Sequence, residues 1–168
     1  IPIAEETDLI LHLGEWVLRK VCREAAGWTQ PYIVAVNVSP IQFKLGNLPE
    51  LIHEILLQTG LPAHRLELEI TESALIDDLQ RALDLLRRIK ALGVSIAMDD
   101  FGTGYSSLST LQAFPFDKLK IDKSFVDKID SRHQASVIVT AVLGLGRSLD
   151  IPVLAEGVEN EAQRTFLD

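Results

Sequence analysis

The sequence places side chains with oxygen ligands at the ends of apolar, strand-like segments. These residues are Asn37, Glu69, Asp99, Asp100 and Glu156. Amide and carboxylate oxygens are the ligands that hard cations such as Mg²⁺ and Mn²⁺ prefer. A single acid of this kind is ordinary on an acidic surface. The shared position of the whole set at strand ends predicts a site for divalent cations.

Residues 99–107, with the sequence DDFGTGYSS, join an expected strand to an expected helix. This segment differs from the dinucleotide-binding fingerprint because Ser107 occupies the position of the third glycine. Two consecutive acids can serve two ions or bridge them, as in hydrolases whose two metals lie about 3.5–4 Å apart. The segment therefore favours metal-assisted chemistry on an anionic substrate.

Lys120 is the one cation that the strand pattern is expected to place beside these acids. It could serve as a counter-charge only, or it could orient an attacking water and stabilise charge on a phosphate. Zinc is disfavoured because the four histidines and the single cysteine fall on expected helices or loops. The residues alone thus predict a metal-dependent hydrolase with a phosphoester as its substrate.

The elements that position these residues alternate along the chain. Strands are expected at residues 32–38, 66–71, 94–99, 119–122 and 152–156. Helices are expected at residues 7–26, 49–59, 77–92, 106–114 and 131–149, with a last one beginning near residue 160. Helix–strand units of roughly 30 residues predict an α/β fold with a parallel sheet covered by helices.

Two architectures fit this order. An open, doubly wound sheet concentrates its site at one switch point, whereas a barrel gathers side chains from the ends of several strands around one mouth. Polar residues end all five expected strands, which favours the barrel. Within the strands, polar positions such as Glu67 and Glu69 alternate with aliphatic ones such as Leu68. The polar face is therefore expected to point into the barrel, and the aliphatic face toward the helices.

Composition restricts the function further. The chain has 168 residues, 47% of them hydrophobic, which fits one folded domain rather than a disordered segment. Its net charge of −8 and its lack of a basic block argue against DNA binding. No apolar run approaches the roughly 20 residues of a membrane span. A single cysteine forms no internal disulfide, which fits the cytoplasm.

Several longer motifs occur in a fixed order. They are IPIAE at 1–5, VNVS at 36–39, ELEITES at 67–73, DDFGTGYSS at 99–107, LKID at 119–122 and AEGVE at 155–159. Together they resemble the EAL-domain family, which hydrolyses the bacterial second messenger cyclic di-GMP. The resemblance covers essentially the whole chain, so residues 1–168 are expected to form a single EAL domain.

The resemblance implies a TIM-type (β/α) barrel with one antiparallel strand. It also implies a phosphodiesterase that uses two Mg²⁺ or Mn²⁺ ions and a water activated between them to give linear pGpG. The family's metal ligands correspond to Asn37, Glu69, Asp99, Asp100 and Glu156. Glu156 also matches a residue assigned in some accounts as the general base, and Lys120 matches the lysine that contacts the nucleophilic water.

The resemblance assigns supporting roles to three further acids. Glu72 matches the glutamate that steadies the segment beginning at Asp99, close to a dimer interface of the family. Asp122 and Glu159 match additional active-site acids. The implied partners are cyclic di-GMP, a second copy of the chain, and sensor or GGDEF-type domains that are fused to the chain or regulate it. The resemblance also implies a role in the regulation of biofilm formation or motility.

Some features of the family are missing from the sequence. The Glu-Ala-Leu segment is expected before Ile1 and a last, glutamine-bearing strand after Asp168, so the barrel is expected to be incomplete. Asp8 stands where the family usually has glycine, a change expected to be tolerated at a helix start. The alternative function is an inactive EAL-like receptor that binds cyclic di-GMP without cleaving it. An unrelated Mg²⁺-dependent barrel enzyme acting on a carbon acid is a more remote alternative.

Overall fold

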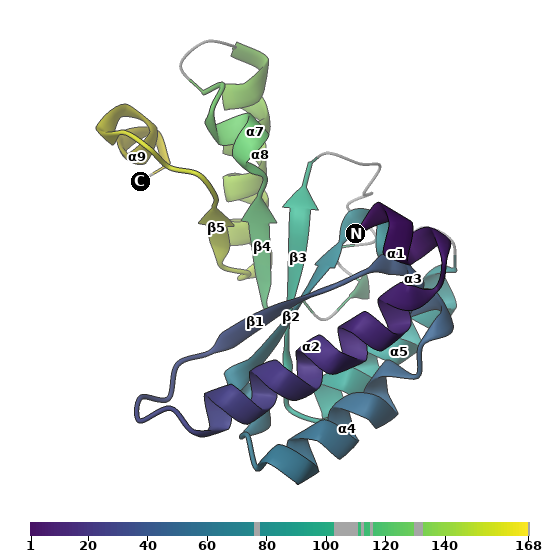
Figure 1. Ribbon diagram of the computed structural model, residues 1–168. Helices are drawn as coiled ribbons and strands as arrows, with labels where there is room; N and C mark the ends of the chain where they lie inside the picture. Colours follow the sequence, from purple (N-terminus) through teal and green to yellow (C-terminus); the bar gives the residue numbers. More distant parts are fainter. Residues whose placement is uncertain (76–77, 103–110, 112, 115, 130–132, 168) are drawn as a thin grey trace.

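The sheet contains all five expected strands. The computed structural model describes residues 1–167 except 76–77, 103–110, 112, 115 and 130–132. The strands are β1 (Val34–Val38), β2 (Leu66–Thr71), β3 (Ser95–Phe101), β4 (Lys118–Ile121) and β5 (Val153–Ala155). They form one parallel sheet in chain order, β1-β2-β3-β4-β5 (Figure 1). Each strand lies within two residues of its expected bounds, so this prediction is confirmed.

The expected long helices are present, apart from that at 106–114, which lies largely outside the described residues. The longer helices are α2 (Leu9–Ala26), α4 (Leu48–Thr59), α5 (Leu79–Ala91), α8 (His133–Leu149) and α9 (Glu161–Leu167). Shorter elements were not expected: α1 (Pro2–Glu6), α3 (Pro40–Leu45), α7 (Lys123–Val126) and the 3-10 turns η1 (Ala63–Arg65) and η2 (Glu72–Leu75). Hydrophobic periodicity needs a window of about 11 residues, which these elements do not fill.

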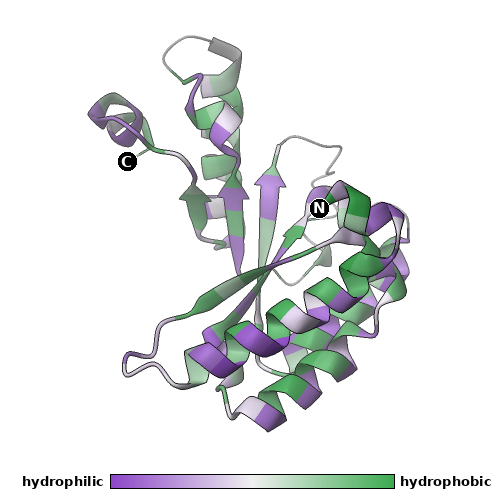
Figure 2. Ribbon diagram, in the orientation of Figure 1, coloured by the Kyte–Doolittle hydropathy of each residue, from purple (hydrophilic) through white to green (hydrophobic). Residues whose placement is uncertain are grey.

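The helices bury the aliphatic face of the sheet. Leu68, Ile96 and Leu119 are fully buried, and they belong to one core with residues from α2, α4, α5 and α8. In Figure 2 these helices carry alternating hydrophobic and hydrophilic segments, and the end of β3 is largely hydrophilic. The opposite face of the sheet carries the charged positions of β2 and β4. The predicted division into an aliphatic and a polar face is therefore confirmed.

Strand order decides between the two architectures. An open, doubly wound sheet reverses its strand order at a switch point, but this sheet continues without reversal from β1 to β5. The arrangement is that of consecutive strands of a TIM-type barrel. The barrel is not closed by the described strands, and all of them are parallel, so the antiparallel strand implied by the resemblance is not among them.

Asp8 adopts a left-handed conformation immediately before α2. Its φ angle is 55°, in the region that glycine enters freely and that aspartate tolerates better than most residues. This backbone geometry gives a physical reason for the glycine that the family usually has there. Helix α2 begins at the next residue, Leu9.

Gly14 makes room for a buried side chain that supports the end of β1. Oε1 of Gln42 accepts a hydrogen bond from the Ser39 N–H at 3.2 Å, within a capping box that starts α3 two residues after Asn37. A Cβ atom on Gly14 would lie 1.7 Å from Nε2 of Gln42. The Gly14→Ala substitution must therefore displace Gln42.

We expect Gly14→Ala to lower the free energy of unfolding by about 1–3 kcal/mol, as overpacking does elsewhere. Gly144→Ala is the matched control because it lies in α8 with nothing within 4 Å of its added Cβ. The control should stabilise the protein by roughly 0.5–1 kcal/mol through helix propensity. Denaturant unfolding measures both changes, and an equal effect at the two glycines would contradict this interpretation.

Candidate active site

A bulge in β3 turns two consecutive aspartates toward the polar face of the sheet. Met98 pairs with Leu119 and Phe101 pairs with Ile121, so Asp99 and Asp100 together oppose the single residue between those partners. Asp100 has a left-handed φ of 54°. Consecutive residues of a regular strand face opposite sides, and a bulge breaks that alternation. Met98 and Phe101 stay in the core while both aspartates lie near the site.

The ammonium of Lys120 lies at the centre of three carboxylates. Its Nζ atom is 2.8 Å from Oε1 of Glu69, 3.0 Å from Oδ1 of Asp99 and 2.7 Å from Oε1 of Glu156. These side chains come from β2, β3, β4 and the residue that follows β5. Lys120 is 8% exposed and Glu156 is the most exposed partner at 38%. The strand ends therefore meet in one charged cluster, as the sequence predicted.

The cluster has an excess of negative charge. Burial alone lowers the pKa of Lys120, but hydrogen bonds to Glu156, Glu69 and Asp99 outweigh it and raise the pKa above its usual value. The pKa of Asp100 is raised by burial and by the charges of Asp99, Asp122 and Glu156. Among these described residues, one ammonium thus lies among five carboxylates, an imbalance that a bound cation would relieve.

The donor chemistry of the cluster fits a hard divalent cation. Asn37 lies opposite Glu69 in the β1–β2 register, on the same face of the sheet as the carboxylates. Within the described part of the chain, no three His, Cys, Asp or Glu side chains already surround a common metal position. Three of the acids contact Lys120 instead. The fit to Mg²⁺ or Mn²⁺ therefore rests on the oxygen donors and the uncompensated charge.

The other predicted acids have different surroundings. Glu159 is exposed and pairs with Lys123 at 2.5 Å, so the structure does not bring it to Lys120. Glu72 is buried at the start of η2, which contacts β2 and β3. Its predicted role is to steady the segment beginning at Asp99, and most of that segment lies outside the described residues.

Asp122 caps a short helix in addition to lying near the cluster. Its carboxylate accepts a hydrogen bond from the Ser124 N–H at 3.0 Å at the start of α7. Hydrogen bonds from Ser124 lower the pKa of Asp122. A carboxyl with a lowered folded-state pKa stabilises the fold above its unfolded pKa and loses that effect as the pH falls through the folded pKa.

Two substitutions separate the structural and electrostatic effects of Asp122. Asp122→Ala should lower the free energy of unfolding by about 1 kcal/mol at pH 7, and by less in strong acid, because the N-cap is lost. Asp122→Asn should retain most of this stability, since asparagine caps helices equally well. Thermal unfolding at pH 7 and pH 3 measures the difference. Equal destabilisation by both changes would refute the capping role.

A second lysine lies on the polar face beside Lys120. As the alternation of β4 predicts, Lys118 lies on the same face as Lys120, and it pairs with buried Glu67 rather than with the acids around Lys120. The spacing of the two lysines in β4 carries this information, because residues two apart share a face. The partner could not be read from the sequence, since it lies two strands away.

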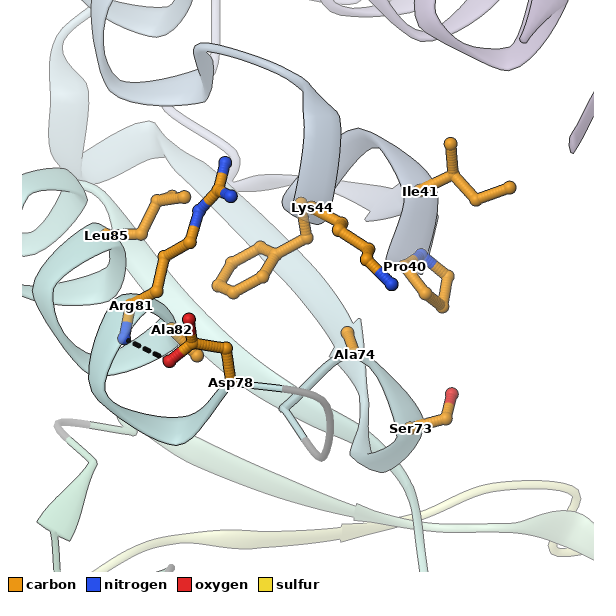
Figure 3. A pocket seen from close by; sticks show the side chains of 10 residues that line it. Pro40, Ile41, Lys44, Ser73, Ala74, Asp78, Arg81, Ala82 and Leu85 are labelled. Atoms are coloured by element: carbon orange, nitrogen blue, oxygen red, sulfur yellow. Dashed lines mark hydrogen bonds between the residues drawn. The ribbon is translucent and has the colours of Figure 1, made fainter.

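The described residues also line a cavity of about 310 Å³ between α3, η2 and α5 (Figure 3). Phe43 and Leu85 give it an apolar wall, and the side chains of Lys44 and Arg81 also line it. None of the predicted site residues lines this cavity. It is separate from the charged cluster.

A parallel sheet with acids gathered at its strand ends defines the chain as part of a TIM-type barrel with an oxygen-rich site. A sequence profile of the EAL domain matches residues 1–168, and the chain belongs to the EAL-domain family. The family resemblance is thereby confirmed. None of the helices that the structure describes is long and apolar enough to cross a membrane.

The relatives include signalling proteins much longer than this chain. An uncharacterized signaling protein of Caulobacter vibrioides is 67% identical over 167 residues, which cover 99% of this chain and 21% of that protein. MucR of Pseudomonas aeruginosa, named a bifunctional diguanylate cyclase/cyclic di-GMP phosphodiesterase, is 42% identical over 171 residues, with 99% and 25% coverage. The chain thus spans about a fifth to a quarter of these relatives.

Solved structures agree with the fold. The MucR phosphodiesterase in complex with c-di-GMP matches with a TM-score of 0.94 and 43% identity, covering 99% of this chain and 74% of that one. A manganese/cy-diGMP complex of Klebsiella pneumoniae BlrP1 matches with a TM-score of 0.83 and 28% identity, covering 94% and 40%. The strand arrangement of this chain is therefore that of EAL domains.

Proposed function

We propose that this chain supplies a site for the divalent-cation-dependent hydrolysis of cyclic di-GMP to linear pGpG. The observation that carries the proposal is the convergence of Glu69, Asp99 and Glu156 on Lys120 at the strand ends. Family membership and the names of MucR and BlrP1 supply the substrate class. An intact set of oxygen donors within this chain favours catalysis over binding alone.

The proposed cation ligands are Asn37, Glu69, Asp99, Asp100 and Glu156. When bound at such a cluster, Mg²⁺ or Mn²⁺ supplies positive charge for a phosphate and makes a water more acidic. The side chains around Lys120 define the boundaries of the site. The carboxylates of Glu69 and Asp99, whose side chains are 11% and 13% exposed, fix one side of the site, while Glu156 leaves the other side open to solvent.

Lys120 can donate a hydrogen bond to a water, and Glu156 can accept a proton from it. All three carboxylate partners of Lys120 lie within hydrogen-bond distance of its Nζ atom. We propose that Glu156, the most exposed of them, releases Lys120, which then donates to a water or a phosphate oxygen. Glu156 accepts the proton that the attacking water loses. The water oxygen bonds to phosphorus as the bond to the ribose 3′-oxygen on the opposite side breaks, and that oxygen takes up a proton from solvent.

Three further acids surround the proposed site. Glu72 positions the segment beginning at Asp99, and Asp122 and Glu159 line the approach to the site. The protein works in the cytoplasm as a homodimer, and sensor or GGDEF-type domains regulate it. Residues 1–168 form part of a single EAL domain whose barrel includes further strands.

Turnover by the full-length protein tests this function. The protein is incubated with cyclic di-GMP and Mg²⁺ or Mn²⁺, and with EDTA as the control, and the nucleotides are separated chromatographically. We expect pGpG only when the cation is present. Binding of cyclic di-GMP without cleavage, measured in the same samples by equilibrium dialysis, would overturn the proposal and identify a receptor.

A further inference from the structure

We propose that Glu67 is a positioning residue that keeps the ammonium of Lys118 away from the cation site. This inference rests on the proposed function, because it assumes that the cluster around Lys120 binds divalent cations. Neither Glu67 nor Lys118 belongs to the predicted ligand set. Their ion pair lies on the same face of the sheet, one side-chain layer before the cluster.

The pair is tightly built. Nζ of Lys118 lies 2.7 Å from each carboxylate oxygen of Glu67. Glu67 is 5% exposed, and the side chain of Lys118 is 27% exposed. Two hydrogen bonds to one buried carboxylate hold the ammonium in a defined position.

The sheet register explains how two side chains from non-adjacent strands meet. Glu67 belongs to β2 and Lys118 to β4, with β3 between them. The β3 residue beside Lys118 is Ala97, which is small and fully buried and which also pairs with Glu69. The long side chains can therefore join across β3 without a bulky residue between them.

The position of Lys118 makes it a potential competitor for the acids. It precedes Lys120 by two residues, so the two lysines are about 7 Å apart along the same face. A flexible lysine side chain can cover such a distance. A second ammonium among Glu69, Asp99 and Asp100 would neutralise the charge that attracts a divalent cation. The carboxylate of Glu67 prevents this because its two hydrogen bonds hold the ammonium of Lys118 away from these acids.

A purely structural ion pair would behave differently. If the pair only stabilised the interior, removing either partner would leave one buried charge unpaired, and both single variants would damage the site in the same way. The positioning role predicts opposite outcomes for the two partners. Removing Glu67 frees a competing cation, whereas removing Lys118 takes the competitor away.

The test measures Mn²⁺ binding to the full-length protein by isothermal titration calorimetry, without nucleotide. We expect Glu67→Gln to weaken Mn²⁺ binding at least tenfold. Lys118→Met should leave it unchanged or make it tighter. The double variant Glu67→Gln/Lys118→Met should return to within about threefold of the wild type, because it has neither the restraint nor the competitor.

Thermal unfolding monitors folding in each variant, and the double variant decides the question if Glu67→Gln alone fails to fold. Weaker binding in Lys118→Met, or an unrescued loss in the double variant, would overturn the inference. So would wild-type affinity in folded Glu67→Gln, or a wild-type protein that binds no Mn²⁺. The failure of the proposed function gives a different result: the wild-type protein binds Mn²⁺ but leaves cyclic di-GMP uncleaved.

Discussion

Glu69→Gln is expected to reduce cyclic di-GMP turnover by about 10³-fold at a fixed Mn²⁺ concentration, a loss of about 4 kcal/mol in transition-state stabilisation. Glu69 lies near the end of β2, and its buried carboxylate contacts Lys120 at 2.8 Å. Glutamine keeps the shape and can still accept a hydrogen bond from Lys120, so the fold should survive. The lost charge removes the ability to hold a divalent cation.

Glu24→Gln is the matched control for this change. Glu24 is an exposed acid of α2 that pairs loosely with Lys20 at 3.7 Å, and exposed pairs of this kind contribute little. Initial rates of pGpG formation and circular dichroism should be measured for both variants. If the turnover rate of Glu69→Gln is within tenfold of the rate of the control, Glu69 is not a ligand of the cation.

Lys120→Met is expected to reduce turnover by a similar factor and to make folding depend on the cation. Without the ammonium, Glu69, Asp99 and Glu156 face one another without a counter-charge. Breaking a buried ion pair of this kind lowers stability by about 3–5 kcal/mol. The cation should restore part of this loss, because it binds the folded state and replaces the missing charge.

The measurement is the melting temperature with EDTA and with Mn²⁺. We expect a larger Mn²⁺-induced rise in Lys120→Met than in the wild type, without recovery of turnover. Lys20→Met is the control, because Lys20 is exposed and lies over the ring of Trp16. Its Mn²⁺ response should match the wild type. An equal response in all three proteins would show that Lys120 does not share its carboxylates with a cation.

The pKa of Lys120 predicts the pH range of its contribution. Because the folded-state pKa is raised by its carboxylate partners, the stabilisation is fully present below the unfolded pKa of lysine. It is lost only as the pH rises through the folded value, in strong alkali. Loss of activity on mildly alkaline titration therefore belongs to another group.

The sequence predicted the strands and the polar face of the sheet because both depend on local patterns. A period of two residues separates Glu67 and Glu69 from Leu68 and Ile70, and this alternation by itself identifies the polar face. The polar ends of successive strands then indicate a barrel mouth. Asp99 and Lys120 were placed correctly in this way.

Features that depend on pairing between strands could not be predicted. The bulge at Asp100 becomes visible only from the register of β3 against β4. The pair between Glu67 and Lys118 depends on Ala97 in the intervening strand. The ion pair between Glu159 and Lys123 likewise cannot be read from the motif that contains Glu159.

Hydrolysis in water labelled with oxygen-18 tests the central claim most directly. Cyclic di-GMP is incubated with the full-length protein and Mn²⁺ in this solvent, and the product is analysed by mass spectrometry. The proposal predicts pGpG with one labelled oxygen on its terminal 5′-phosphate, because water attacks the phosphorus and the ribose 3′-oxygen departs. Unlabelled product, a 2′,3′-cyclic phosphate end, or intact cyclic di-GMP would contradict a site that activates water for phosphodiester hydrolysis.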